Sequence, residues 1–231
     1  SLGTAYILGA GNSATASGTG WGLRFASNTL QFAAGGGVTL QLISSAVYRD
    51  PAAWYHVVLA VDTTQATASN RSKLYVNGIQ VTSLSTASYP SQNQALDWNY
   101  ASATSYLGGY NDAGTIVTFD GYLAEINSVD GQALAPTAFG TFNSYGVWQP
   151  ITYGGSYGTN GFYLPFTNTT STTTLGYDFS PNGNNWTPNN INSTTVGSTS
   201  TVRVFNSSST WTAPAGVTSV SYLVVAGGGG G

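Results

Sequence analysis

Residues 54–62 read WYHVVLAVD and residues 73–81 read KLYVNGIQV, and these two stretches decide the fold class. In the first, every second residue from Tyr55 to Val61 is apolar, which is the period of a half-buried β-strand. In the second, two strand-like runs flank Asn77–Gly78. This dipeptide readily supplies the positive φ angles of a type I′ turn. Both stretches therefore predict antiparallel β-structure.

Working outward from these stretches, further short alternating runs occur along most of the chain. Glu, Lys and Arg, which favour helices, are scarce, whereas Gly, Thr, Ser, Tyr and Val are abundant. Many short strands without intervening helices predict an all-β fold, an antiparallel sandwich or barrel. The only helical turn is expected within 132–140. The other predicted strands are 21–26, 29–33, 38–43, 105–108, 115–119, 121–127 and 161–166.

The composition excludes several classes of partner. The chain has 231 residues, of which five are basic and eight acidic, and its net charge is −3. So few cations cannot neutralise a run of phosphates, which argues against nucleic acid as a partner. No apolar run approaches the roughly 20 residues of a transmembrane helix. The absence of Cys is consistent with folding in a reducing cytoplasm.

The composition also changes along the chain and predicts three parts. Residues 1–190 are expected to form one module, in which the strands before Trp21 are missing or eroded. Within it, residues 141–190 either close the module or begin a second one. Residues 191–200 are small and polar and are expected to be a linker. Residues 201–231 are expected to start a glycine-rich unit. This glycine-rich end and the absence of Met indicate a stretch of a longer protein.

The order of these motifs resembles the concanavalin A-like lectin/glucanase superfamily, including its laminin G-like modules. The resemblance rests on the two opening stretches, on YLGGYND at 106–112 and on FDGYLAEINSVDGQAL at 119–134. More narrowly, 49–82, 119–140, 157–166 and 178–190 resemble lectin-like modules in structural proteins of marine tailed phages. The end of the chain resembles the start of glycine-rich domains in phage fibre proteins. The resemblance implies a jelly-roll sandwich on a virion surface.

One patch has the composition of a sugar site. Sugar binding needs an aromatic face that stacks on the pyranose ring, together with amides or carboxylates that bond its hydroxyls. LDWNYAS at 96–102 and GGYNDAG at 108–114 supply these groups on two predicted loops. Alternatively, these aromatic residues anchor a neighbouring subunit or cover the core. The candidate residues are Asp97, Trp98, Asn99, Tyr100, Tyr110, Asn111 and Asp112.

The residues argue against an enzyme. Glycoside hydrolysis in this superfamily uses closely spaced carboxylates. Here Glu125 is the only Glu, and Asp120 and Asp130 lie beside glycines, as turn residues do. Residues 154–158 match a nucleophile elbow but lack the strand and helix that the motif needs. His56, the only His, is interpreted as a strand residue whose ring is satisfied locally.

No cofactor is predicted. Asp178 to Gly183 follow the first positions of a calcium loop, but the closing acidic position is Asn189. An Asx turn explains this segment without a metal. Calcium on Asp97 or Asp112 is compatible with a lectin-like fold, although nothing in the sequence fixes it.

The predicted function is that of a non-enzymatic surface protein of a tailed-phage virion, a tail fibre or appendage folded in the bacterial cytoplasm. Its lectin-like module would bind host cell-surface glycans weakly at each site, and multivalency on a homotrimer would strengthen adhesion. Its partners would be host polysaccharide and other virion proteins. The alternative is a purely structural fibre or capsid-decoration protein that makes subunit contacts and binds no sugar.

Overall fold

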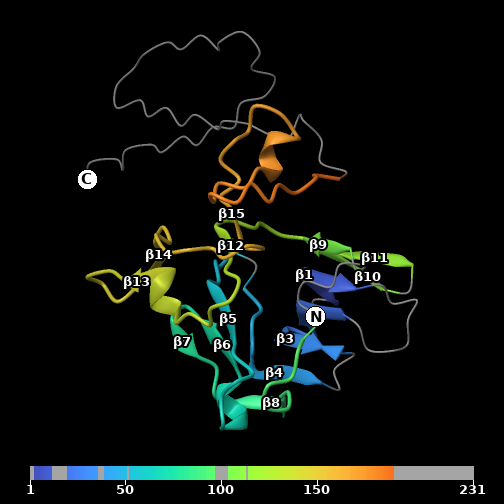
Figure 1. The fold of residues 1–231 in the computed structure, drawn as a ribbon, viewed down its shortest axis with the longest axis vertical. Coiled ribbons are helices and arrows are strands. Elements are labelled where there is room, and N and C mark those ends of the chain that lie inside the picture. The colour runs from blue at the N-terminus through green and yellow to red at the C-terminus, as the bar shows by residue number, and fades with distance from the viewer. Residues whose placement is uncertain are drawn as a thin grey trace, which may run out of the picture.

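The described part of the chain is built from short antiparallel β-strands (Figure 1). A computed structural model describes residues 3–11, 20–35, 39–50, 52–96, 104–112 and 114–189. The earlier strands are β1 (Ala5–Gly11), β2 (Gly20–Ala26), β3 (Thr29–Ala34), β4 (Leu40–Val47), β5 (Val57–Val61), β6 (Ser72–Val76), β7 (Ile79–Gln80), β8 (Leu84–Ser88) and β9 (Ser105–Leu107). The later strands are β10 (Gly109–Asp112), β11 (Thr115–Thr118), β12 (Ile126–Ser128), β13 (Gly140–Phe142), β14 (Trp148–Pro150) and β15 (Phe162–Leu164). Short 3-10 helices are η2 (Ala68–Asn70), η3 (Pro136–Ala138) and η4 (Thr174–Gly176).

The largest sheet has six strands in the order β8–β4–β3–β2–β1–β9. Side chains alternate between its two faces, as the pleat of a strand requires. The outer face carries Tyr6, Arg24 and Gln31 in register on adjacent strands. The inner face carries the buried apolar residues Trp21, Leu30, Phe32, Ala34, Leu40 and Leu42.

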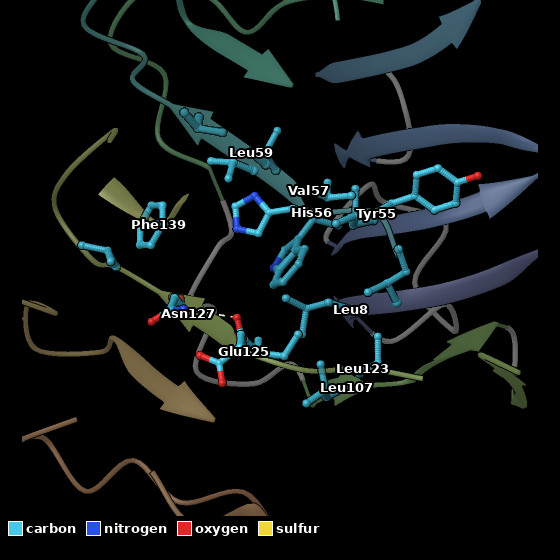
Figure 2. A pocket seen from close by; sticks show the side chains of 18 of the residues that line it. Leu8, Tyr55, His56, Val57, Leu59, Leu107, Leu123, Glu125, Asn127 and Phe139 are labelled. Atoms are coloured by element: carbon cyan, nitrogen blue, oxygen red, sulfur yellow. Dashed lines mark hydrogen bonds between the residues drawn. The ribbon is translucent and has the colours of Figure 1, made fainter. Parts of the chain in front are cut away.

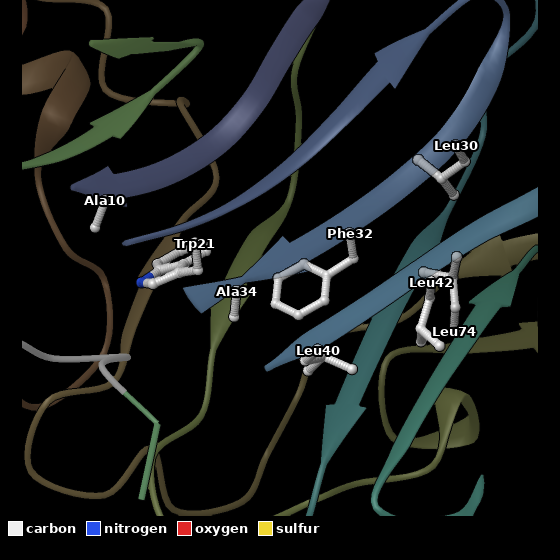
Figure 3. Close-up of a cluster of buried hydrophobic side chains, with 8 residues drawn as sticks. All are labelled: Ala10, Trp21, Leu30, Phe32, Ala34, Leu40, Leu42 and Leu74. Atoms are coloured by element: carbon white, nitrogen blue, oxygen red, sulfur yellow. The ribbon is translucent and has the colours of Figure 1, made fainter. Parts of the chain in front are cut away.

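A second sheet, β5–β6–β7, packs on this inner face. Leu74 of β6 is 1% exposed and belongs to the same buried cluster as Phe32 and Leu42 (Figure 3). Apolar side chains of two facing sheets interdigitate in this way in a β-sandwich. The predicted all-β, antiparallel jelly-roll sandwich is confirmed.

Two tight hairpins connect strands through residues with positive φ. Asn77 and Gly78 join β6 to β7 with φ of 49° and 79°, which confirms the predicted type of turn. The Asn77 side-chain Oδ1 accepts the backbone N–H of His56 at 2.8 Å, which ties this turn to the segment before β5. Ser27 and Asn28 join β2 to β3 with φ of 49° and 66°.

Several sequence predictions were wrong in detail. The strands before Trp21 were expected to be missing or eroded, but β1 lies there and pairs with β2 along its length. Residues 108–114, expected to be a loop, contain β10 and turn into β11. The strand expected at 121–127 begins only at Ile126, because Glu125 has a φ of +54° and an extended strand excludes that angle. The helical turn expected within 132–140 is present as η3.

A strand pair joins a later segment of the chain to the earlier part. β15 pairs with β12, so residues 162–164 share a sheet with residues 126–128. Whether 141–190 close this module or begin a second one stays a prediction. The expected linker at 191–200 and glycine-rich unit at 201–231 lie outside the described residues. No helix in the described ranges is long and apolar enough to span a membrane.

Candidate functional site

The predicted sugar patch lies only partly within the described residues. Its first half, residues 97–100, lies outside them. Its second half, Tyr110, Asn111 and Asp112, lies on β10 and not on a loop. The Asn111 side-chain Oδ1 accepts the Gly114 N–H at 2.9 Å, so this carbonyl holds the turn between β10 and β11.

Tyr110 packs on the outer face of the six-stranded sheet. Its ring stacks on Tyr6, with centroids 4.5 Å apart and planes at 18°. Glycines make room for the two rings. A Cβ atom on Gly9 would lie 2.8 Å from Tyr110 Cδ2, and a Cβ atom on Gly22 would lie 2.7 Å from Tyr6 Cε1. Glycine inside a strand often marks such a close approach.

A polar network lies beside this aromatic pair. Arg24 Nη1 donates to the Tyr6 hydroxyl, and Arg24 Nε donates to Gln31 Oε1 at 3.2 Å. Gln31 Nε2 in turn donates to Thr29 Oγ1 at 3.0 Å. Arg24 Cζ also lies 5.2 Å from the centre of the Tyr6 ring. The outer face therefore carries the partly buried ring of Tyr110, stacked on the buried Tyr6, next to oriented hydrogen-bonding groups. An aromatic ring beside such groups is the combination that sugar recognition uses.

A cavity of about 1250 Å³ lies on the other side of this sheet. It is lined by the inner face of β1 and β2, by β5 and by residues 119–134. Figure 2 shows Leu8, Leu107 and Leu123 on one side of the cavity and Phe139 with Asn127 on the other. Ligand pockets usually measure about 300–1,000 Å³, so this cavity has room for several sugar rings.

The ring of His56 lies in this cavity (Figure 2). Its Nδ1 is buried and has no hydrogen-bond partner among the described residues, so the prediction of a locally satisfied ring was wrong. Burial lowers the pKa of His56 below 6.5, which keeps the ring neutral at neutral pH. Its centre lies 5.8 Å from that of Trp148. The sequence placed His56 on a strand but gave no sign of the cavity, which long-range packing creates.

Two exposed aromatic residues also line the cavity, and they lie where it meets solvent. Trp54 is 65% exposed and Tyr122 is 85% exposed. Their ring centres are 6.5 Å apart and their planes are at 45°. Asp50 and Asp120 line the same cavity and are exposed. Sequence reasoning assigned Trp54 and Tyr122 to strands; the Asp-Gly turn signal just before Tyr122 could have indicated its exposure.

Glu125 lies deeper in the cavity wall and is held by tyrosine contacts. Its Oε2 accepts the Tyr163 hydroxyl at 2.6 Å, and its backbone carbonyl accepts Asn127 Nδ2 at 3.2 Å (Figure 2). Asn127 Oδ1 then accepts the Tyr157 hydroxyl at 2.8 Å. The only Glu of the chain therefore takes part in a structural hydrogen-bond network.

These tyrosines are expected to make the fold less stable at alkaline pH. Burial, followed by repulsion from the charges of Tyr153, Asp178 and Glu125, raises the pKa of Tyr157 from 10.0 to about 12. Burial and the Glu125 hydrogen bond also raise the pKa of Tyr163. In the unfolded chain both phenols ionise near pH 10. The free energy of unfolding is therefore retained below pH 10.0 and falls as the pH rises toward about 12.

Urea unfolding at a series of alkaline pH values measures this fall. Tyr163→Phe removes one of the two phenols and is expected to make the fall shallower. Tyr145→Phe is a control, because Tyr145 is 89% exposed and its phenol lies in solvent. A free energy of unfolding that does not change between neutral pH and pH 12 would contradict the raised pKa values of Tyr157 and Tyr163.

The segment that matches a nucleophile elbow lacks the geometry of one. β14 ends at Pro150 and the next strand begins at Phe162, so neither a strand nor a helix adjoins residues 154–158. The Ser156 hydroxyl accepts the backbone N–H of Gly158 at 3.3 Å, a contact within a local turn. This arrangement does not expose Ser156 as a nucleophile between a strand and a helix.

The predicted Asx turn at Asp178 is confirmed. Asp178 Oδ1 accepts the Tyr163 and Ser180 N–H groups, each at 2.8 Å. Its Oδ2 accepts the Ser180 hydroxyl and the Asn184 N–H, each at 2.8 Å. Burial alone would raise the pKa of Asp178, but these hydrogen bonds outweigh it and lower the pKa. The carboxylate thus fastens the loop to β15.

The described residues contain no group of three or more His, Cys, Asp or Glu side chains that could hold a metal ion.

Comparison with known proteins identifies the family. A model of the concanavalin A-like lectin/glucanases superfamily matches residues 3–138. This match covers more than half of the chain, which therefore belongs to that superfamily. Neither a curated protein nor a solved structure gives a significant match. Membership suggests carbohydrate binding in general terms, and it agrees with the aromatic and polar surfaces described above.

Proposed function

We propose that the chain is a non-enzymatic surface protein of a tailed-phage virion, and that its lectin-like module binds host cell-surface glycans. The observation that carries the binding step is the Tyr6–Tyr110 pair, which lies beside the Arg24–Gln31 network on the outer face of the sheet. Membership of a lectin-containing superfamily supports the ligand class. The virion setting is supported by the resemblance of residues 49–82 and 157–166 to phage modules.

Binding at such a site combines stacking with hydrogen bonds. The apolar face of a pyranose packs on an aromatic ring, and its hydroxyls bond to amide and guanidinium groups that other contacts already orient. Arg24 and Gln31 are oriented in this way by Tyr6 and Thr29. A single site of this kind binds weakly, and display of several copies on a trimeric fibre would raise the avidity without new contacts.

Tyr110→Ala is expected to weaken glycan binding by about tenfold, because it removes one ring of the stacked pair. A glycan array probed with a multivalent preparation of the protein measures this loss. Trp98→Ala tests the half of the patch that lies outside the described residues. Tyr110→Phe is the matched control, since it keeps the ring and the packing on Gly9. The proposal fails if no glycan binds the multivalent wild-type protein.

The structural alternative also has an observation in its favour. The β13–β14 hairpin and the adjacent β7 expose apolar side chains that a subunit contact would cover. Trp148 packs on the β6–β7 turn, where a Cβ atom on Gly78 would clash with the indole, and this joins the two elements into one surface. Sedimentation of the purified protein tests whether copies of the chain associate through this surface. Tyr145→Ser is the variant expected to disrupt that association. The exposed residues are Ile79, Phe142, Tyr145, Val147 and Ile151.

A further inference from the structure

The Trp54–Tyr122 pair at the opening of the cavity lies outside the predicted sugar patch. The two residues come from separate segments: Trp54 precedes β5, and Tyr122 lies between β11 and β12. More than half of each side chain is exposed, although burial in a core would have removed both rings from water. Rings 6.5 Å apart and inclined at 45° form an angled surface of about the width of a sugar ring.

The groups around this pair are acidic or neutral. Asp50 Oδ1 accepts the Ala52 N–H at 2.9 Å, which fixes the orientation of that carboxylate. Asp120 makes no hydrogen bond or ion pair with the described residues. No Lys or Arg is among the described residues that line the cavity, and His56 is neutral. Anionic ligands would meet like charge here, whereas hydroxyl and ammonium groups would find acceptors.

We propose that Trp54 and Tyr122 form a second sugar-binding subsite, selective for neutral and amino sugars over acidic ones. The inference rests on the proposed glycan binding and specifies the class of sugar at one place. A pyranose stacks on the indole of Trp54, and its hydroxyl or ammonium group donates to Asp120.

Isothermal titration with oligosaccharides of glucose, of glucosamine and of glucuronic acid tests the subsite. The wild type is expected to bind the first two and to bind the glucuronic acid oligosaccharide at least about tenfold more weakly. Trp54→Ala and Tyr122→Ala are each expected to weaken binding about tenfold. Asp120→Asn is expected to weaken binding of the glucosamine oligosaccharide more than that of the glucose oligosaccharide, because it removes the negative charge.

Three controls separate stacking from a loss of fold. Tyr122→Phe keeps the ring and is expected to bind within about twofold of the wild type. Tyr177→Ala removes a ring that is 40% exposed and does not line the cavity, and it should leave binding unchanged. Near-ultraviolet circular dichroism and the unfolding temperature of each variant report folding. Because Trp54 and Tyr122 are exposed, the spectra and unfolding temperatures of Trp54→Ala and Tyr122→Ala are expected to match those of the wild type.

The outcomes distinguish the subsite from the general proposal. If Tyr110→Ala loses binding while Trp54→Ala and Tyr122→Ala bind like the wild type, glycan binding stands and the subsite is wrong. If the glucuronic acid oligosaccharide binds most tightly and Trp54→Ala abolishes that binding, the proposed selectivity is wrong. If the multivalent wild type binds no oligosaccharide and no glycan on an array, the proposed function fails and the subsite with it.

Discussion

Phe32→Ala is expected to lower the free energy of unfolding by about 3–5 kcal/mol. Phe32 is fully buried on β3, and its ring centre lies 6.5 Å from that of Trp21. Removing the ring forfeits its burial and leaves a void that the flanking leucines can fill only in part. Urea or guanidinium unfolding of the purified chain, followed by fluorescence, measures the loss.

Phe179→Ala is the matched control for this prediction. The same ring is removed, but Phe179 is 51% exposed, so the change in unfolding free energy should stay within about 1 kcal/mol. Equal losses for the two variants would show that the cluster around Phe32 does not carry the stability of the sandwich.

Gly161→Ala is expected to destabilise the fold by about 3 kcal/mol, through a steric clash rather than through lost contacts. A Cβ atom at this position would overlap the Tyr157 carbonyl oxygen and lie 2.6 Å from the Ser128 carbonyl oxygen. Both are backbone atoms, so no side-chain rotation relieves the overlap. The Gly161 carbonyl also accepts Asn182 Nδ2 at 2.8 Å, and the required shift would break this bond.

Gly154→Ala provides the comparison. Nothing lies within 4 Å of a Cβ atom built on Gly154, and its backbone is not in the left-handed region. The substitution should change the unfolding free energy by less than about 0.5 kcal/mol. If Gly161→Ala were as mild as Gly154→Ala, the close packing between β12 and β15 would be wrong.

Features encoded over a few neighbouring residues could be predicted from the sequence. The Asn77–Gly78 turn, the strands around it and the Asx turn at Asp178 each depend on side chains within a short window. β1 was not predicted, because the glycines within it weaken the sequence pattern of a strand. Gly9 is explained by Tyr110, which packs against it from β10, and by the backbone of Trp21 on the neighbouring strand. Both contacts are invisible to a local pattern.

In the candidate site too, residue types could be predicted from the sequence, whereas contacts between distant segments could not. Sequence reasoning selected Tyr110 by residue type, but its stacking partner Tyr6, and Arg24 that bonds to Tyr6, come from distant strands. Trp54 and Tyr122 were assigned to strands, since nothing local reveals that the fold brings them together beside a cavity. The turn-like φ of Glu125 was also missed, because a strand pattern runs through it and the tertiary contacts override that pattern.

One edge of the six-stranded sheet, formed by β9, bears on how copies of this protein behave when crowded. β9 has only three residues and stops at Gly108, whose φ of +73° turns the chain away. Exposed edges recruit strands from other molecules, and charged side chains are one of the devices by which proteins oppose this. Here only 6% of residues are charged. The short β9 offers few open backbone groups to a neighbouring strand, so at this edge the geometry of the chain, rather than charge, opposes association.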